Sequence, residues 1–375
     1  MIIGVPSETK DGENRVGIVP AGVKSLVEDG HEVYIQKDAG LGSGIKNEEY
    51  TRYGAKLLDT PKEVYEVADM IMKVKEPQEE EFEYLQEDQI LFCFLHLAAE
   101  EAVTKALAEK NVTAIAYETI DFPEKEGYLP LNTPMSEISG RLAVQFGAQY
   151  LNKNHGDRGV LLGGIPGVDP GKVVILGAGT VGQNAAKIAV GFEADVTVIN
   201  RGERKLRYIN DIYQGRVKTL KSNEFNIHNA VKDADLVVGA VLIPGAACPK
   251  LLTEEMIKDM PEGSVIVDVC IDQGGVAETS KVTYHSDPVY EKHGVLHYGV
   301  TNMPGSVPRT SSFGLTKSTL SYAKRIVNEG FEKAMAEDPG FAMGMNVYKG
   351  HVVYEAVAEA LDMEYTPLEE LLDLS

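Results

Sequence analysis

Three glycines, Gly177, Gly179 and Gly182, are spaced as Gly-x-Gly-x-x-Gly and follow the apolar run KVVIL at residues 172–176. Residues 183–189 after them have a helical pattern. In such a strand–turn–helix, the first glycine permits a tight turn, the second lets the backbone approach a pyrophosphate, and the third lets the helix pack closely on the strand. The free N–H groups at the helix N-terminus attract phosphates. Because strand, turn and helix occur in the required order, this segment predicts a dinucleotide-binding site rather than an ordinary glycine-rich turn.

Three side chains in the first hundred residues have the chemistry to handle a small acidic substrate: Arg15, Lys75 and His96. A guanidinium can bind a carboxylate through two parallel hydrogen bonds. A histidine with an unperturbed pKa near neutrality suits proton transfer. Each of the three follows an apolar run that we expect to be a parallel strand, and the carboxyl ends of such strands meet at one edge. We therefore expect the three side chains to lie together.

Each of these residues also has a structural interpretation. Arg15 lies in a polar loop and could be solvated, and His96 closes a buried run, where a histidine often has only a structural role. Lys73 and Lys75 would point the same way from a strand, so one of the two could be merely a neighbour.

The segment VDVCIDQGG, residues 267–275, supplies a carboxylate in the second half of the chain. Asp272 precedes a Gly-Gly pair beyond the end of a predicted strand, beside the expected position of a nicotinamide ring. There it could pair with His96 or hold a polar intermediate. Asp268, inside the strand, is interpreted as structural.

The choice between NAD and NADP depends on Asn200. A dinucleotide domain that prefers NAD usually has an acidic residue about 20 positions past the glycine turn, bonded to the ribose 2′-hydroxyl. Here Asn200 stands at that place, followed by the basic residues Arg201, Arg204 and Lys205. A neutral side chain removes the repulsion of a 2′-phosphate, and the basic residues could bind one. Alternatively, Asn200 bonds the NAD ribose and the basic residues are solvated or stack on adenine.

The elements that must position these residues alternate between strand and helix. Strands are predicted at Ile2–Val5, Glu32–Gln36, Ala55–Leu58, Met70–Lys75, Ile90–His96, Val112–Tyr117, Val173–Leu176, Val196–Ile199, Leu236–Val241, Ser264–Asp268 and Leu296–Val300. Helices are predicted at Ser136–Leu151, Leu315–Asn328, Val352–Met363 and Leu368–Leu374, besides those between the strands. This alternation predicts an α/β fold of two doubly wound, Rossmann-like domains with a cleft between them. We expect residues 134–305 to form the dinucleotide domain, inserted into a discontinuous substrate domain of residues 1–133 and 306–375.

Composition narrows the class of protein. The 375 residues are 43% hydrophobic and 25% charged, typical of a globular chain, and the net charge of −21 argues against binding to nucleic acid or to anionic membranes. Three cysteines without metal-ligand spacing are expected to be buried thiols, and no metal is predicted. No signal peptide and no apolar run long enough to span a membrane is found, so we expect a cytoplasmic protein.

The chain resembles the alanine dehydrogenase family over nearly its whole length. The resemblance rests on eight segments: 4–10 (GVPSETK, followed by Glu13 and Arg15), 73–77 (KVKEP), 94–98 (FLHLA), 116–119 (AYET), 134–137 (PMSE, followed by Gly140 and Arg141), 163–168 (GGIPGV), 271–275 (IDQGG) and 301–304 (TNMP). Together they are far more specific than the glycine turn.

The resemblance implies reversible oxidative deamination of L-alanine to pyruvate and ammonia by a homohexamer. It implies that Arg15 and Lys75 bind the substrate and that His96 and Asp272 transfer protons. The cofactor-binding residues, implied by the resemblance or by the glycine turn and Asn200, are Ser136, Gly177, Ala178, Gly179, Thr180, Val181, Gly182, Asn200, Arg201, Lys205, Ser222, Val241, Leu242, Asn302 and Met303. The position of Asn200 is normally Asp in the family, so NAD is expected first, with NADP or dual use open.

Three other functions fit the same plan. The first is the NAD-binding subunit of a proton-translocating nicotinamide nucleotide transhydrogenase, and the second a related amino-acid dehydrogenase with a larger substrate. The third is a nucleotide-binding module without catalysis. The presence of Lys75, His96 and Asp272 in one chain favours the alanine dehydrogenase function, because a pump component would not need them.

Overall fold

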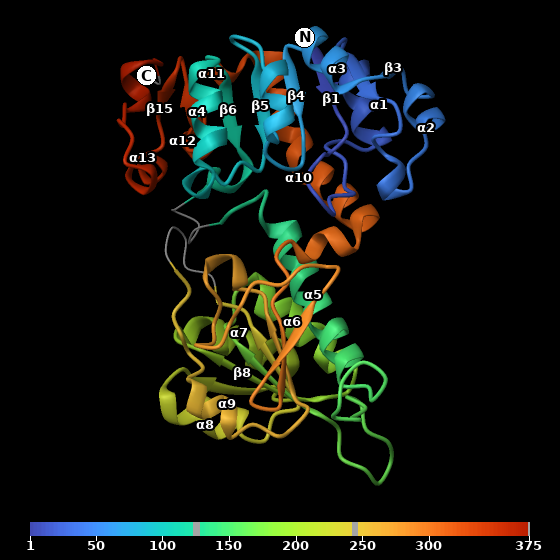
Figure 1. Cartoon of the computed structure of the whole chain (residues 1–375), viewed down its shortest axis with the longest axis vertical. Helices are drawn as coiled ribbons and strands as arrows, with labels where there is room; N and C mark the ends of the chain where they lie inside the picture. Colours follow the sequence, from blue (N-terminus) through green and yellow to red (C-terminus); the bar gives the residue numbers. More distant parts are fainter. Residues whose placement is uncertain (123–127, 242–246, 374–375) are drawn as a thin grey trace. The chain divides into compact units, whose positions relative to one another are not determined.

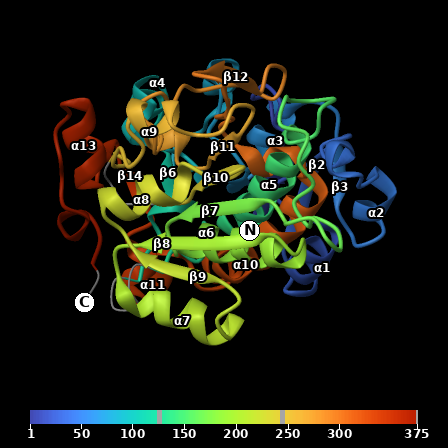
Figure 2. The same cartoon turned by 90° about the horizontal axis from the view of Figure 1, so that it is seen from below.

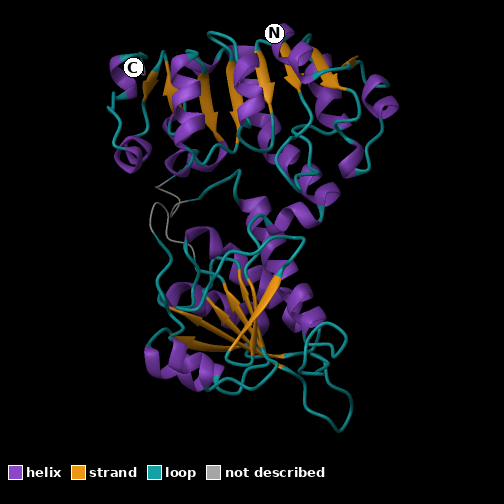
Figure 3. Cartoon of the chain, viewed as in Figure 1, coloured by secondary structure: helices purple, strands orange, loops and turns teal. Residues whose placement is uncertain are grey.

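The computed structural model describes residues 1–122, 128–241 and 247–373 of the chain (Figure 1). It divides into two compact units. Unit 1 comprises Met1–Met135 and Val307–Ser375, and unit 2 is the inserted segment Ser136–Ser306. In each unit helices flank a central sheet (Figure 3). The predicted fold class, two doubly wound α/β units with one inserted into the other, is confirmed.

Unit 1 contains an eight-stranded sheet with the order β15-β14-β6-β5-β4-β1-β2-β3. Its strands are β1 (Ile2–Val5), β2 (Glu32–Gln36), β3 (Lys56–Leu58), β4 (Met70–Met72), β5 (Ile90–Cys93), β6 (Thr113–Ala116), β14 (Met345–Tyr348) and β15 (His351–Val352). The first six are parallel, whereas β14 runs antiparallel to β6 and β15 antiparallel to β14.

The strands of unit 1 are apolar on both faces because helices cover both. Along β4, Met70 and Met72 join the core that contains residues of α1 and α10, whereas Ile71 faces the core with α3 and α4. Burial of each such side chain contributes roughly 1.5–3 kcal/mol. The helices are α1 (Pro20–Glu28), α2 (Asn47–Thr51), α3 (Pro61–Val67), α4 (Glu101–Glu109), α10 (Pro308–Glu329), α11 (Phe331–Ala336), α12 (Pro339–Ala342) and α13 (Glu355–Leu361), with short 3-10 turns η1 (Leu41–Ser43), η2 (Glu79–Tyr84), η3 (Leu97–Ala99), η4 (Tyr117–Thr119) and η8 (Leu368–Glu370).

Unit 2 contains a seven-stranded sheet with the order β12-β13-β11-β10-β7-β8-β9. Figure 2 shows its strands β7, β8 and β9 side by side. The strands are β7 (Lys172–Leu176), β8 (Asp195–Asn200), β9 (Lys218–Lys221), β10 (Leu236–Gly239), β11 (Val265–Asp268), β12 (Val289–Lys292) and β13 (Val295–Tyr298), and only β12 is antiparallel to its neighbour. The helices are α5 (Thr133–Tyr150), α6 (Thr180–Gly191), α7 (Glu203–Tyr213), α8 (Glu224–Val231) and α9 (Glu254–Lys258), with η6 (Ile271–Gln273) and η7 (Met303–Ser306).

The parallel part of each sheet has the same winding. Numbered along the chain within each unit, the strands stand in the order 3-2-1-4-5-6, read from β3 to β6 in unit 1 and from β9 to β13 in unit 2. In such sheets the chain changes direction between the first and fourth strands, and ligands bind at the carboxyl ends there. That point lies between β1 and β4 in unit 1 and between β7 and β10 in unit 2.

Some predicted elements differ from the structure. The predicted strands Met70–Lys75 and Ile90–His96 end earlier, at Met72 and Cys93. The strands β9, β12, β14 and β15 were not predicted. β9 (KTLK) and β12 (VYEK) are partly exposed and have no continuous apolar run, and β14 and β15 depend on pairing with distant parts of the chain.

The predicted helix Val352–Met363 was wrong at its start. Lys349 and Gly350, with φ of 49° and 79°, form a two-residue hairpin turn between β14 and β15. The residues after this turn pair as a strand, so α13 begins only at Glu355. The predicted helix Leu368–Leu374 reduces to η8, and residue 374 lies outside the described residues. Among the helices that the structure describes, none is long and apolar enough to cross a membrane.

Candidate active site

Arg15, Lys75 and His96 follow three neighbouring strands of unit 1, β1, β4 and β5. Two of these strands flank the point where the winding changes direction. Because these strands are neighbours in one sheet, their carboxyl ends lie at the same edge, and the positive charges of Lys75 and Arg15 both lower the pKa of the His96 imidazole. The structure thus brings together the three unit 1 residues that the sequence singled out.

Arg15 is buried and paired, not solvated. Only 3% of its surface is exposed, and its Nε lies 2.7 Å from Oε1 of Glu13, while Nη2 lies 2.5 Å from Oε2. The backbone N–H of Arg15 also donates to Oε1 of Glu13. A third guanidinium nitrogen, Nη1, lies 3.2 Å from Sδ of Met135. Glu13 therefore orients Arg15 from two positions earlier in the chain, a role that sequence reasoning did not assign to it.

Lys75 has 13% of its side chain exposed at the strand edge, and its Nζ lies 4.0 Å from Oε2 of Glu76. Glu76 is buried and also pairs with Lys10. The backbone N–H groups of Val74 and Lys75 donate to the carboxylate of Glu8, at 2.6 and 3.2 Å. Because Glu8 follows β1 and Lys75 follows β4, this carboxylate joins the two segments at the change of winding.

Lys73 has a different role from Lys75, because β4 ends at Met72 and the strand alternation stops there. Its side chain is fully buried, with Nζ 2.9 Å from Glu81 and 3.6 Å from Glu8. One positive charge cannot neutralise both carboxylates. Burial, only partly offset by Lys73, therefore raises the pKa of Glu8 to about 7. Burial would lower the pKa of Lys73, but the two carboxylates outweigh it and raise that pKa.

His96 stands in the left-handed region, with φ of 51° and ψ of 35°, just before η3. Its ring stacks on Phe94, with centroids 5.9 Å apart, and 47% of the side chain is exposed. Desolvation, and then the positive charge of Lys75, lower the pKa of His96, although Glu76 acts in the opposite direction. The exposed part of the ring keeps some hydration, which limits the shift. Because its pKa is lowered, the imidazole is neutral at neutral pH and can accept a proton.

The three glycines of the turn in unit 2 differ in what a side chain would meet at each position. Gly177 has a φ of 114°, and a Cβ on it would lie 2.3 Å from the carbonyl oxygen of Ala240. A Cβ on Gly182 would lie 2.0 Å from the carbonyl oxygen of Gly177. A Cβ on Gly179, in contrast, would meet nothing within 4 Å. Gly179 caps the N-terminus of α6 without a side-chain hydrogen bond. This bare, positively polarised helix end fits the pyrophosphate of a dinucleotide.

Asn200, the last residue of β8, holds the glycine turn. Its Oδ1 accepts the N–H of Ala178 at 3.1 Å, and its Nδ2 donates to the carbonyl oxygen of Gly202 at 2.9 Å. A carboxylate could make the first of these bonds but not the second, because it has no N–H. The basic residues Arg201 and Lys205 are exposed on the following segment.

Asp272 is exposed on η6, in the loop that follows β11. Asp268 at the end of β11 is buried and closes that loop. Its carboxylate accepts N–H groups from Cys270 at 3.1 Å and Val276 at 2.8 Å, and the hydroxyl of Ser280 at 2.5 Å. The structural interpretation of Asp268 fits this geometry. The predicted pairing of Asp272 with His96 joins residues of different units and stays a prediction.

The remaining cofactor candidates of unit 2 also lie at loops and helix starts. Ser136 lies in the first turn of α5 and Ser222 directly follows β9. Val241 follows β10 and donates its N–H to the sulfur of Cys270 at 3.1 Å. Asn302 has a φ of 58° and precedes the buried Met303. Leu242 lies outside the described residues.

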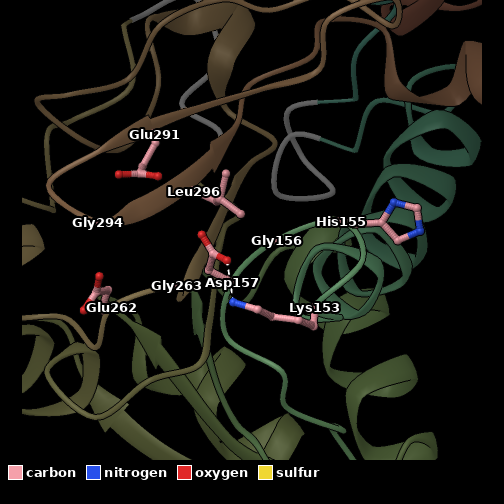
Figure 4. A pocket seen from close by; sticks show the side chains of 9 residues that line it. All are labelled: Lys153, His155, Gly156, Asp157, Glu262, Gly263, Glu291, Gly294 and Leu296. Atoms are coloured by element: carbon pink, nitrogen blue, oxygen red, sulfur yellow. Dashed lines mark hydrogen bonds and ion pairs between the residues drawn. The ribbon is translucent and has the colours of Figure 1, made fainter.

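A cavity of about 260 Å³ in unit 2 is separate from these residues (Figure 4). Its lining includes Lys153 and Asp157, whose side chains pair at 2.7 Å, together with Glu262 and Glu291. None of the predicted site residues lines it. Within the part of the chain that the structure describes, no group of three His, Cys, Asp or Glu side chains could hold a metal ion.

Unit 2, with its doubly wound sheet and a Gly-x-Gly-x-x-Gly turn where the winding changes direction, defines a dinucleotide-binding α/β protein. Comparison with known proteins specifies the family. Two family models match the chain. The model described as "Alanine dehydrogenase/PNT, N-terminal domain" matches residues 4–139, and the model described as "Alanine dehydrogenase/PNT, C-terminal domain" matches residues 143–355. The chain belongs to the alanine dehydrogenase/PNT family.

Relatives match over their full length. An alanine dehydrogenase from Methanococcus maripaludis is 57% identical over 374 residues, with 100% of both chains covered. One from Bacillus subtilis is 54% identical, covering 99% of this chain and 98% of the relative. A solved L-alanine dehydrogenase structure is 48% identical with a TM-score of 0.93, covering 96% of this chain and 99% of that one. A transhydrogenase structure from Sinorhizobium meliloti, 23% identical with a TM-score of 0.81, covers 95% of this chain and 100% of that one, and it shows the fold alone.

Proposed function

We propose that this protein catalyses the reversible, NAD-dependent oxidative deamination of L-alanine to pyruvate and ammonia. The observation that carries the proposal is the identity of 57% and 54%, from end to end, with proteins named alanine dehydrogenase. The grouping of Arg15, Lys75 and His96 at the strand ends of unit 1 supplies side chains suited to that chemistry.

Arg15 and Lys75 hold the substrate in this proposal. Arg15 binds the carboxylate, with Glu13 holding the guanidinium in a fixed orientation. Lys75 then contacts the carbonyl oxygen of pyruvate, and Glu76 acts as its counter-ion. Two fixed cations orient a very small molecule. Orientation of this kind can lower a reaction barrier by up to about 7–11 kcal/mol.

His96 is the proposed general base, with Asp272 of unit 2 as the second proton-transferring residue. Bound NAD would supply the acceptor for the hydride that leaves the alanine Cα. The imine that remains must add water at its carbon, and the neutral His96 accepts the proton that this water releases. The hydroxyl proton of the resulting carbinolamine is then transferred to its nitrogen, the C–N bond breaks, and ammonia and pyruvate are released. The lowered pKa of His96 fits the role of a base that is unprotonated before the reaction.

The proposed cofactor residues are the glycine turn of residues 177–182, Ser136, Asn200, Ser222, Val241, Asn302 and Met303, with Arg201 and Lys205 beside the adenosine ribose. We propose NAD as the preferred cofactor with NADP accepted more weakly. Two features bear on this order. Glu203, in the first turn of α7, adds a negative charge shortly after Asn200, which favours NAD, and it pairs with Lys221 at 3.4 Å. Neutral Asn200 carries no charge that would repel a 2′-phosphate, which is why NADP is accepted as well.

The proposed assembly is a homohexamer in the cytoplasm, supported by the resemblance to the family. Light scattering of the purified protein tests the assembly, and a mass of one or two chains would contradict it.

Oxidation of NADH in the presence of both pyruvate and ammonium tests the proposed function. We expect a rate that needs both compounds, and a reverse rate with L-alanine and NAD. Pyruvate without ammonium serves as the control for simple reduction of a keto acid. A protein that binds NADH but shows no rate with pyruvate and ammonium would contradict the proposal and favour a transhydrogenase subunit.

A further inference from the structure

Glu118 lies beside His96 at the end of the neighbouring strand. It is the central residue of η4, which directly follows β6, and β6 pairs with β5 in parallel register from Ile90 to Cys93. Its side chain is 14% exposed. Because β5 and β6 end at the same edge, the Glu118 carboxylate reaches the segment that carries His96.

Both oxygens of this carboxylate accept backbone hydrogen bonds from the segment after β5. The N–H of Leu95 lies 3.2 Å from each oxygen, and the N–H of His96 lies 2.5 Å from Oε1. Leu95 is fully buried. Without Glu118, its N–H would lose this partner, and a buried unpaired donor costs about 1–3 kcal/mol.

The same hydrogen bonds support an unfavourable backbone conformation. His96 has a φ of 51°, a left-handed conformation that costs roughly 1–2 kcal/mol for a residue with a Cβ. The carbonyl oxygen of His96 accepts a hydrogen bond from the N–H of Ala99, and this bond forms the turn η3. The carboxylate and this turn together determine the direction in which the Cα–Cβ bond of His96 points.

We propose that Glu118 is a positioning residue for His96: its carboxylate holds the N–H groups of Leu95 and His96 and so fixes the left-handed turn that presents the imidazole to the substrate. The inference rests on the proposed function, in which His96 is the general base. Glu118 acts through the backbone, since its Oε1 lies 3.8 Å from Nδ1 of the ring, beyond hydrogen-bond distance.

The alternative is a purely structural role, in which Glu118 only satisfies buried donors. That role predicts a loss of stability without any specific effect on chemistry. The two can be separated by comparing kcat with the binding of NADH, because the residues proposed to bind the cofactor belong to unit 2.

The first experiment compares Glu118→Ala with Glu118→Gln. Displacement of a catalytic group by about 1 Å can cost about 100-fold in rate, so we expect kcat of Glu118→Ala to fall about 100-fold while the Kd of NADH stays within about twofold. Glutamine keeps one carbonyl oxygen as an acceptor, so Glu118→Gln should recover about tenfold of that loss. The control is Glu101→Gln, an exposed carboxylate paired with Lys105, which should behave as wild type. A kcat of Glu118→Ala within about twofold of wild type, or no recovery in Glu118→Gln, would overturn the proposal.

The second experiment places Glu118→Ala in the background of His96→Ala. If Glu118 acts through His96, its removal costs no further activity once the imidazole is gone. Losses that multiply would overturn the proposal, because Glu118 would then act independently. Residual rates are to be measured only with variants whose Tm shows that they are folded, and Glu118→Gln replaces Glu118→Ala in the cycle if the alanine variant is not.

A crystal structure of Glu118→Gln and Glu118→Ala separates a failure of this proposal from a failure of the proposed function. We expect His96 to leave the left-handed region in the alanine variant whatever reaction the protein catalyses. An unchanged φ of His96 there would overturn the positioning role. Absence of any wild-type rate with pyruvate and ammonium, in contrast, would overturn the proposed function alone.

Discussion

A Cβ on Gly182 would lie 2.0 Å from the carbonyl oxygen of Gly177, so the close approach of α6 to this oxygen requires glycine at position 182. Gly179, between them, has open space where its Cβ would be. Two glycines of one turn are therefore needed for different reasons: Gly182 for packing α6 on β7, and Gly179 for leaving room outside the backbone.

We expect Gly182→Ala to prevent or strongly destabilise folding of unit 2, because the obstacle is a backbone oxygen that cannot move aside. Gly179→Ala should fold with a Tm close to wild type but bind NADH at least tenfold more weakly, because its methyl group occupies the space proposed for the pyrophosphate. Thermal unfolding and NADH titration measure both. A Gly179→Ala variant with normal NADH affinity would place the phosphates elsewhere.

His96→Ala should lower kcat by about 10²–10⁴-fold, the usual contribution of a general base, and leave NADH affinity nearly unchanged. The neutral imidazole accepts a proton in the proposed mechanism, and alanine cannot. Steady-state kinetics with pyruvate and ammonium check this prediction, with Glu101→Gln as the matched surface control. Turnover like that of wild type would remove His96 from the mechanism.

Glu13→Gln should lower the free energy of unfolding by about 3 kcal/mol, because it removes the charge that compensates buried Arg15. The same change in an exposed pair, Glu101→Gln, should cost less than about 0.5 kcal/mol. Urea unfolding of the two variants measures the difference. An equal loss of unfolding free energy in the two variants would contradict the burial of the Glu13–Arg15 pair.

The pH dependence of stability should carry a contribution from Glu8. Burial raises the pKa of Glu8 to about 7, whereas the unfolded value is near 4.5. Between these values the folded chain holds a proton that the unfolded chain has released, so this group's contribution to stability falls as pH rises from about 4.5 to 7. Compared with Glu8→Gln, wild type should lose up to about 3 kcal/mol more over that window. Parallel pH profiles of unfolding free energy for the two proteins would contradict the raised pKa.

Asn200→Asp should decrease kcat/KM with NADPH relative to NADH by about tenfold or more, because a carboxylate repels the 2′-phosphate. It should also lower stability by about 1 kcal/mol, since the hydrogen bond from Nδ2 to the carbonyl oxygen of Gly202 is lost. Kinetics with both cofactors and thermal unfolding test the two effects separately. A wild-type preference for NADPH of tenfold or more would reverse the proposed cofactor order.

Most of the parallel strands could be predicted, because helices cover both faces of each sheet and their strands read as continuous apolar runs. β14 and β15 could not, because two short segments gain their pairing from the Lys349–Gly350 turn and from β6, more than 200 residues earlier. A pattern within one segment carries no information about so distant a partner.

The candidate residues at the strand ends could also be predicted, because a parallel sheet brings those ends together. The carboxylates that hold them could not. Glu8 bonds to a turn 66 residues away and Glu118 to one 23 residues away. Both stand in segments on which the family resemblance rests, but nothing in those segments indicates that a glutamate is buried against backbone N–H groups, and only the fold shows this.

The insertion of unit 2 into unit 1 has a consequence for synthesis. Strand β6 at the edge of the first six strands acquires its neighbour β14 only when residues 345–348 have been made, and the core of unit 1 includes Leu315, Ile326 and Phe341. Unit 2, from Ser136 to Ser306, is one continuous segment and has left the ribosome by then. Since domains generally fold as units during translation, we expect the segment that emerges second to finish folding first. Until α10 and β14 have been made, the N-terminal strands of unit 1 keep an unpaired edge and a partly uncovered core.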